Sequence, residues 1–141
     1  MSCDHLLLSV PQLDNQHRKL IALVNEFSAA VDAGSSRAEL ELRVTQLMEA
    51  FQFHFSSEEE LMQSSGFPGA TLHADEHRKL IAQMTVLRDG LSSGNVMLCD
   101  ALALFVRLWT EQHIAGPDRT FAQFLGDGKA GCETGFFSIG Q

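Results

Sequence analysis

The spacing of the histidines constrains the fold of this chain more than any other feature. Five of the six histidines and two acids fall in four separate segments, at intervals that bring side chains together along helices. His54 and Glu58 are four residues apart, as are His73 and His77, so each pair shares one helical face. The full set is His17, His54, Glu58, His73, His77, His113 and Asp118.

The segments around these residues repeat apolar positions three and four apart, which is the pattern of packed helices. We expect a first helix over about 14–32 with Asp14 as its N-cap. Residues 36–39 form a capping box that opens the second helix. Pro68 suits the first turn of the third helix, and the fourth begins near Leu98 and continues through Phe121, Phe124 and Leu125.

Short turns between the four helices imply that consecutive helices are antiparallel. The fold class is therefore all-α, an up-down-up-down antiparallel four-helix bundle over residues 14–125, preceded by an N-terminal arm at 1–13. Five of the eleven glycines lie in residues 126–141, which we expect to be a flexible glycine-rich C-terminal tail or linker. The length of 141 residues fits one domain.

The charge and the cysteines limit the partners and the compartment. A net charge of -8 argues against nucleic acid and anionic membranes as partners. No apolar run approaches the length of about 18 residues that spans a bilayer, so we expect no membrane insertion. The start of the chain does not resemble a signal peptide. Three scattered cysteines, Cys3, Cys99 and Cys132, are typical of reduced thiols in a cytoplasmic protein.

His113 and Asp118 are five residues apart, which is wrong for one face of a regular helix. Gly116 and Pro117 lie between them, and Pro117 has no N–H to donate to the carbonyl of His113. We therefore predict a local distortion of the helix that turns Asp118 back to the face of His113.

A single histidine on an apolar face is usually a hydrogen-bonded core residue. That explanation does not account for five histidines and two acids on the same inner faces, because buried acids are rare unless they are paired or bind metal. The sequence therefore predicts a metal centre. The other acids nearby, Glu59, Glu60, Asp75 and Glu76, lie off this face and are expected to be solvated, and His5 lies outside the pattern.

Seven ligands exceed the needs of one ion, and imidazole with carboxylate suits iron in the core of a helix bundle. We expect two irons. If both carboxylates bridge the irons and one oxo or hydroxo group does the same, a single coordination position of two octahedral ions is left open. A small ligand can bind there.

The residues Asp14-Asn-Gln-His17, His54-Phe-Ser-Ser-Glu58-Glu, His73-Ala-Asp-Glu-His77 and Trp109-Thr-Glu-Gln-His113-Ile-Ala-Gly-Pro-Asp118 resemble the hemerythrins, most closely the bacterial ones. The resemblance covers roughly residues 10–125. It implies a non-haem di-iron site that binds dioxygen reversibly. By the same resemblance His73, His77 and His113 hold the saturated iron, His17 and His54 hold the iron that takes up dioxygen, and Glu58 and Asp118 bridge.

The chain departs from the usual hemerythrin pattern in two places. It has no tryptophan before the first helix, since Trp109 is its only one. Thr110 stands three residues before the last histidine, where the family usually has an apolar residue, so we expect a hydroxyl near the ligand pocket. That makes faster oxidation of the iron, or a sensing role, a competing hypothesis. The residues we expect to line the pocket are Thr110, Trp109, Phe55 and Ile21.

The favoured function is oxygen binding for storage, delivery or sensing, without enzyme activity. One alternative is an oxygen- or redox-sensing module whose C-terminal tail leads to a signalling domain or partner. The other is a di-iron redox enzyme, such as a ferroxidase or a protein that reduces peroxide or NO. Oxygen-activating bundle enzymes have carboxylate-rich sites with Glu-x-x-His pairs, whereas this set is rich in histidine, which favours reversible binding.

Overall fold

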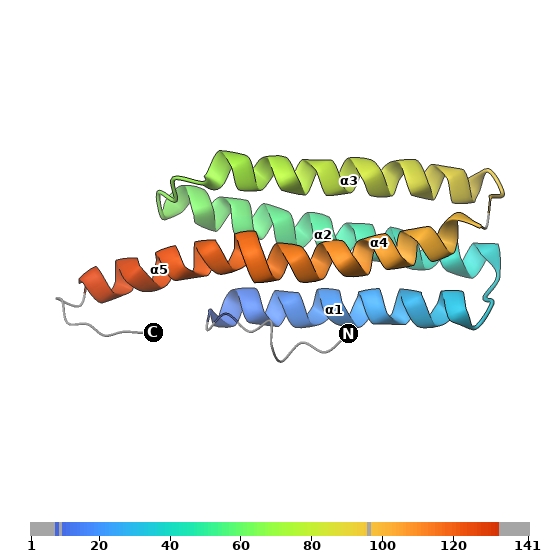
Figure 1. Cartoon of the computed structure of the whole chain (residues 1–141), viewed down its shortest axis with the longest axis horizontal. Helices are drawn as coiled ribbons and strands as arrows, with labels where there is room; N and C mark the ends of the chain where they lie inside the picture. The colour runs from blue at the N-terminus through green and yellow to red at the C-terminus, as the bar shows by residue number, and fades with distance from the viewer. Residues whose placement is uncertain (1–7, 9, 96, 133–141) are drawn as a thin grey trace.

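A computed structural model shows that the protein is a four-helix bundle and describes residues 8, 10–95 and 97–132. The expected all-α fold is confirmed. The fourth helix is divided by a short π-helix into α4, η2 and α5, which continue one another along the chain (Figure 1). The elements are α1 (Pro11–Asp32), α2 (Arg37–Ser64), α3 (Ala70–Ser92), α4 (Leu98–His113), η2 (Ile114–Asp118) and α5 (Arg119–Cys132).

Each helix runs antiparallel to the one before it, as Figure 1 shows by the order of the colours. α1 packs against α2 and α4, and α3 packs against the same two helices. The helices therefore surround a common interior to which all four contribute one face. This is the up-down-up-down order expected from the short turns.

The first three helices end in the same way. A glycine with positive φ follows the last turn of each, at Gly34, Gly66 and Gly94. The amide of Gly34 donates to Val31 and the next amide donates to Ala30, which is the Schellman pattern that satisfies the last carbonyls of a helix. These glycines permit the tight reversals that make consecutive helices antiparallel.

Two helix starts differ from the sequence prediction and two agree, since α4 begins at Leu98 as expected. α1 begins at Pro11, which takes the first helical position, while Asp14 lies inside the helix and accepts a hydrogen bond from the amide of Leu8 at 2.8 Å. α3 begins at Ala70, so Pro68 belongs to the preceding turn. Ser36 caps α2 as expected, since its side chain accepts from the amide of Glu39.

The fourth helix extends further than we predicted. α5 continues through Gly126 as far as Cys132, so the first part of the expected tail is helical. Residues 133–141, like Cys3 and His5, lie outside the described part of the chain. Tail and linker function for this end of the chain stays a prediction.

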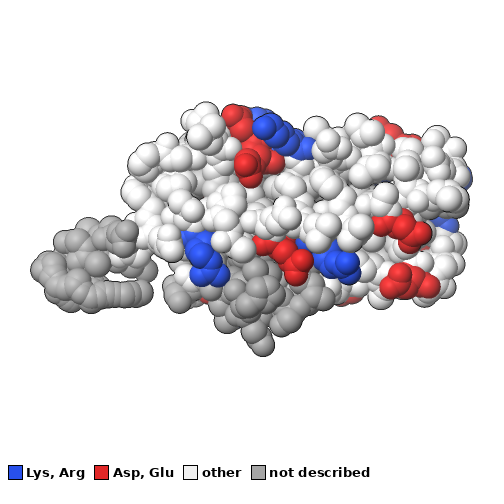
Figure 2. Space-filling model, in the orientation of Figure 1, with Lys and Arg blue, Asp and Glu red and all other residues white. Residues whose placement is uncertain are grey.

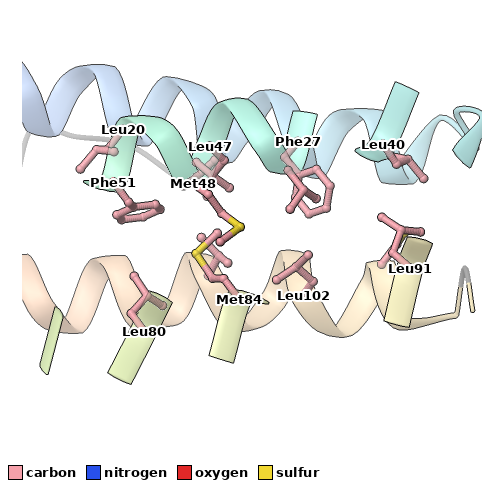
Figure 3. Packing of buried hydrophobic residues seen from close by; sticks show 14 of the residues in the cluster. Leu20, Phe27, Leu40, Leu47, Met48, Phe51, Leu80, Met84, Leu91 and Leu102 are labelled. Atoms are coloured by element: carbon pink, nitrogen blue, oxygen red, sulfur yellow. The ribbon is translucent and has the colours of Figure 1, made fainter. Parts of the chain in front are cut away.

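The apolar core lies in two main parts with the predicted ligands between them. The larger cluster fills the end of the bundle near the α1–α2 and α3–α4 turns; Figure 3 shows Leu20, Phe51, Leu80 and Leu102 among its members. A smaller cluster at the other end is built on Leu13, Met62 and Phe121. In sequence, His17 falls between Leu13 and Leu20, and His54 and Glu58 between Phe51 and Met62. The predicted ligands thus occupy a polar layer between two apolar ones.

The surface in Figure 2 carries acidic and basic side chains interspersed among neutral ones. Among the described residues on this face there is no continuous basic surface of the kind that binds nucleic acid. No helix in the described ranges has the length and apolar character needed to cross a bilayer.

Candidate metal centre

The structure brings all seven predicted ligands together in the interior. Each of them is at most 4% exposed, although histidine and the acids are seldom buried so completely. They form two overlapping groups that share Glu58 and Asp118. The first, five-residue group adds His73, His77 and His113. The second, four-residue group adds His17 and His54.

The three histidines of the five-residue group point the same ring nitrogen at one place. Nε2 of His113 lies 3.0 Å from Nε2 of His73 and 3.1 Å from Nε2 of His77. Two nitrogens each bound to one metal at about 2.1 Å, and at right angles to each other, are about 3.0 Å apart. The spacing of the three imidazoles is therefore that of neighbouring ligands on one ion.

The two carboxylates complete this group. Oε1 of Glu58 lies 3.0 Å from Nε2 of His73 and 3.1 Å from Nε2 of His77. Oδ1 of Asp118 lies 2.8 Å from Nε2 of His73 and 3.0 Å from Nε2 of His113. Five donor atoms from α2, α3, α4 and η2 thus converge on a single point.

Asp118 also faces the second group with its other oxygen. Oδ2 of Asp118 lies 2.9 Å from Nε2 of His17, so the two oxygens of this carboxylate are directed to different groups. Glu58 belongs to both groups as well, with Oε1 toward His73 and His77. Shared carboxylates of this kind suit a pair of ions rather than one.

Several buried polar atoms of the centre lie close to one another, but have no partner in the geometry of a hydrogen bond. Among the described residues there are eight such atoms, and every one belongs to a predicted ligand. A buried polar group without a partner costs on the order of 1–3 kcal/mol, and more when it is charged. A bound metal would satisfy most of these atoms, so the donor set fits two metal ions. The atoms are Nδ1 and Nε2 of His17, Nε2 of His54, both carboxylate oxygens of Glu58, Nδ1 of His113 and both carboxylate oxygens of Asp118.

The predicted distortion of the fourth helix is confirmed. Residues 114–118 form a π-helix that contains Pro117. Hydrogen bonds five residues apart widen the turn, so a residue five positions on returns to the same face. This brings Asp118 alongside His113, five residues earlier, and explains how both reach the interior from one element.

The pKa values of the predicted ligands show how strongly these groups interact. Burial lowers the pKa of His54 from 6.5 to about 4. Burial alone would also lower the pKa of His73, but the close carboxylates of Asp118 and Glu58 raise it to about 9. Burial would raise the pKa of Asp118, yet the surrounding imidazoles of His113, His17 and His73 hold it well below its usual range.

Glu58 behaves in the same way. Burial and the nearby charge of Asp118 act to raise its pKa, but the close imidazoles of His73 and His77 outweigh them and lower it. Both carboxylates therefore stay ionised in the interior. Anionic oxygens held beside imidazole nitrogens form a donor set that attracts cations.

Residues other than the seven predicted ligands contact the Nδ1 atoms of three histidines, which face away from the metal positions. We call these the outer nitrogens. Nδ1 of His77 donates to Oε2 of Glu59 at 2.8 Å, and Nδ1 of His54 donates to Oε1 of Gln16 at 2.6 Å. Oε1 of Glu76 lies 3.5 Å from Nδ1 of His113 without a hydrogen bond, and adds only a nearby negative charge. Hydrogen bonds of this kind orient metal-bound histidines and set which nitrogen faces the ion.

The sequence prediction missed these partners. Glu59 was expected to be solvated, but its carboxylate contacts a buried histidine. Glu76 is half-exposed and lies at the edge of the same group. Each partner sits beside a ligand in sequence yet serves a histidine of another helix, so spacing within one helix gives no signal for it. The identity of a polar residue next to a ligand, as with Gln16 before His17, is the only hint.

The four residues expected to line the ligand pocket are placed differently from one another. The ring of Trp109 stacks on His113 at 4.3 Å between centroids, and Phe55 stacks on His77, so both cover the five-residue group. Thr110 is buried and donates its hydroxyl to the carbonyl of Val106 at 2.6 Å. Ile21 packs in an apolar cluster with Leu8, Ile114 and Ala122.

A surface groove reaches the second group. It has a volume of about 430 Å³ and lies between α1 and α2. Gln16 and His54 line it together with the exposed ring of Phe53. The four-residue group is therefore the one that this groove adjoins.

Known proteins share this arrangement. The family description "Hemerythrin HHE cation binding domain" matches residues 8–125. A bacteriohemerythrin of Stenotrophomonas maltophilia (strain R551-3) is 28% identical over 119 residues, which are 84% of this chain and 76% of that protein. A hemerythrin-like protein of Naegleria gruberi is 32% identical over 114 residues, 81% of this chain and 83% of that protein.

A solved structure agrees with the sequence comparison. A crystal structure of wild-type hemerythrin superposes with a TM-score of 0.80 at 26% identity, covering 87% of this chain and 94% of the other. The family match over residues 8–125 includes the ligand-bearing parts of all four helices. With its buried cluster of histidine, glutamate and aspartate able to bind a metal, the chain belongs to the hemerythrin family.

Proposed function

We propose that this protein holds two iron ions and binds dioxygen reversibly, for storage, delivery or sensing. The observation that carries the proposal is the position of Asp118, whose two carboxylate oxygens face two different groups of histidines. A single-ion site would need only one of these groups. The relatives named hemerythrin and bacteriohemerythrin support iron as the metal.

The residues have distinct roles in this proposal. His73, His77 and His113 hold one iron, His17 and His54 hold the other, and Glu58 and Asp118 bridge the two. An oxo or hydroxo group is the expected third bridge. Two ferrous ions in these positions would supply both the electrons and the open coordination position that reversible dioxygen binding requires.

The two groups differ in the number of protein donors. Five residues converge on one position and four on the other. The group with fewer donors contains His17 and His54, and it adjoins the groove between α1 and α2. This difference favours the position near His54 as the one where a small ligand binds.

The surroundings favour binding over oxygen chemistry. The aromatic rings of Phe55 and Trp109 lie directly on ligand histidines, and apolar clusters pack on both sides of the polar layer. Such packing keeps water, and with it the protons that would drive reduction of dioxygen, away from the His77 and His113 side of the centre. We therefore favour an oxygen-binding protein over a ferroxidase or a peroxide- or NO-reducing enzyme.

Storage and sensing use the same metal site and differ in the partner. A sensing role needs a signalling domain or partner, which we expected beyond the glycine-rich tail. We propose a cytoplasmic location from the three scattered cysteines, which are typical of reduced thiols.

Metal analysis and an optical spectrum test the proposal. Iron-loaded protein should contain close to two Fe per chain, and the reduced protein should gain an absorption band in air that disappears when oxygen is removed. Asp118→Asn should lower the iron content, whereas Glu60→Gln, an exposed acid on α2, should not. One zinc per chain without iron uptake, or a band that never reverses, would contradict it.

A further inference from the structure

The histidines of the two groups donate their outer N–H to different kinds of acceptor. Nδ1 of His77 donates to the carboxylate of Glu59 at 2.8 Å, and Nδ1 of His54 donates to the side-chain amide of Gln16 at 2.6 Å. The first acceptor carries a negative charge and the second is neutral. These two contacts affect ligands of two different metal positions, since His77 belongs to the five-residue group and His54 to the four-residue group.

The other histidines increase this difference. The carboxylate of Glu76 lies 3.5 Å from Nδ1 of His113, which places a second negative charge behind the five-residue group. Nδ1 of His17 has no hydrogen-bond partner, so the four-residue group gains no charge there. Among the described residues, both outer carboxylates within reach of a ligand histidine therefore belong to the same group.

The neutral contact on His54 is held in place by a third residue. Nε2 of Gln16 donates to the hydroxyl of Ser57 at 3.2 Å, which leaves Oε1 of the same amide to accept from His54. The orientation of the amide is thus fixed by two partners on α2. Gln16 is therefore held against His54 by hydrogen bonds and does not merely lie near it.

We propose that Glu59 and Gln16 make the two iron positions electronically unequal, so that the iron held by His73, His77 and His113 is oxidised first. The inference rests on the proposed di-iron function. Glu59 and Gln16 are positioning residues that act through His77 and His54. The protein then stabilises the state with one ferrous and one ferric ion relative to an equal pair.

The physical reason is the charge of the acceptor. A carboxylate behind an imidazole makes the ring a stronger donor, and a hydrogen bond to a charged group is roughly twice as strong as one between neutral groups. A stronger donor stabilises the more positive ferric ion. In the first oxidation one electron passes from the ferrous ion to an added oxidant such as ferricyanide, and the Nδ1 protons stay on the histidines.

Two reciprocal substitutions test the proposal. Glu59→Gln removes the charge and keeps an oxygen that accepts from His77. Gln16→Glu adds the charge behind His54, and the hydroxyl of Ser57 is able to donate to the new carboxylate. Glu60→Gln is the matched control, because it removes the same charge from the next residue of α2, where the side chain is exposed.

The measurement is a redox titration of the iron-loaded protein, with the mixed-valence signal followed by electron paramagnetic resonance and the iron content determined on the same samples. The separation of the two one-electron potentials gives the comproportionation constant. We expect Glu59→Gln and Gln16→Glu each to lower this constant about tenfold, a change of about 59 mV in the separation. Glu60→Gln should change it less than twofold.

Three results would overturn the inference. They are an unchanged separation in both variants, an equal change in Glu60→Gln, and a larger separation in Gln16→Glu. If a variant loses iron, the other variant still decides, because the two act on opposite sides of the centre. Failure of the wild-type protein to take up two irons would instead contradict the proposed function itself.

Discussion

The ring of Phe55 lies flat on the imidazole of His77, with 3.8 Å between the ring centroids and 5° between the planes. Phe55 is buried on α2, one residue after His54, and His77 comes from α3. The stack covers one face of a predicted ligand, while Glu59 holds the edge of the same ring at Nδ1. One residue of the core thus contributes both to packing and to the aim of a ligand nitrogen.

Replacing Phe55 by alanine should destabilise the metal-free protein. Truncation of a buried phenylalanine costs about 3–5 kcal/mol, since it removes buried apolar surface and leaves a cavity. We expect the free energy of unfolding from urea denaturation to fall by about 3 kcal/mol. Phe53→Ala is the matched control on the same helix, because Phe53 is 67% exposed, and it should change that free energy by less than about 0.5 kcal/mol. Equal effects would show that the stack contributes nothing.

Iron should raise the thermal stability of the protein. The eight buried atoms without partners all belong to predicted ligands, so the metal-free fold bears a cost that metal binding removes. At a free iron concentration about a thousandfold above the dissociation constant, linkage stabilises the folded state by about 4 kcal/mol, or roughly 10 °C in the melting temperature. Calorimetry of metal-free and loaded protein measures this. The same pair of scans on Glu58→Gln should show a much smaller rise.

The stability of the metal-free protein should be greatest near pH 6.5. The pKa of His54 is lowered by burial from 6.5 to about 4, so between these values the unfolded chain binds a proton that the folded chain does not, and stability falls as the pH is lowered. The carboxylates of Asp118 and Glu58 outweigh burial and raise the pKa of His73 to about 9, so stability also falls as the pH rises from 6.5 to 9. Each loss is on the order of 3 kcal/mol.

Urea denaturation at pH 5, 6.5 and 8.5 measures both limbs of this profile. His54→Gln should flatten the acid limb and leave the alkaline one. The pKa values of Asp118 and Glu58 are also lowered, but their contribution is lost only below the ordinary range of a carboxyl group, so the interval from 6.5 to 5 reports mainly on His54. A wild-type profile that is flat from pH 5 to 8.5 would contradict the assignment.

The sequence predicted the fold and the inward face of each helix because both depend on local rules. Apolar residues three and four apart can be read along one helix, and His54 and Glu58 occupy such positions. Even the irregular step between His113 and Asp118 was predictable, since Pro117 removes a donor at a defined place and the structure has a π-helix there. These features need no knowledge of neighbouring helices.

The residues that serve the ligands from other helices were not predictable in this way. Glu59 and Gln16 have the polar character of surface positions, and only the packing of α2 on α3 and of α1 on α2 brings them to His77 and His54. The start of α1 was misjudged for a related reason. Asp14 has the chemistry of an N-cap, but its carboxylate accepts a hydrogen bond from the amide of Leu8, and Pro11 begins the helix.

The last prediction concerns Thr110, which stands where hemerythrins usually have an apolar residue. Its hydroxyl is buried and donates to the carbonyl of Val106, so it must leave that bond before it can donate toward the metal centre. A hydrogen bond is worth about 1 kcal/mol net, or roughly fivefold in a rate. We therefore expect Thr110→Leu to slow the decay of the oxygen-dependent absorption about fivefold with iron content unchanged, and Thr110→Ser, which keeps the hydroxyl, to decay like the wild type. Stopped-flow mixing of the reduced protein with air measures the three rates. A Leu variant that decays as fast as the wild type, or faster, would show that the hydroxyl stays on Val106 or protects the centre.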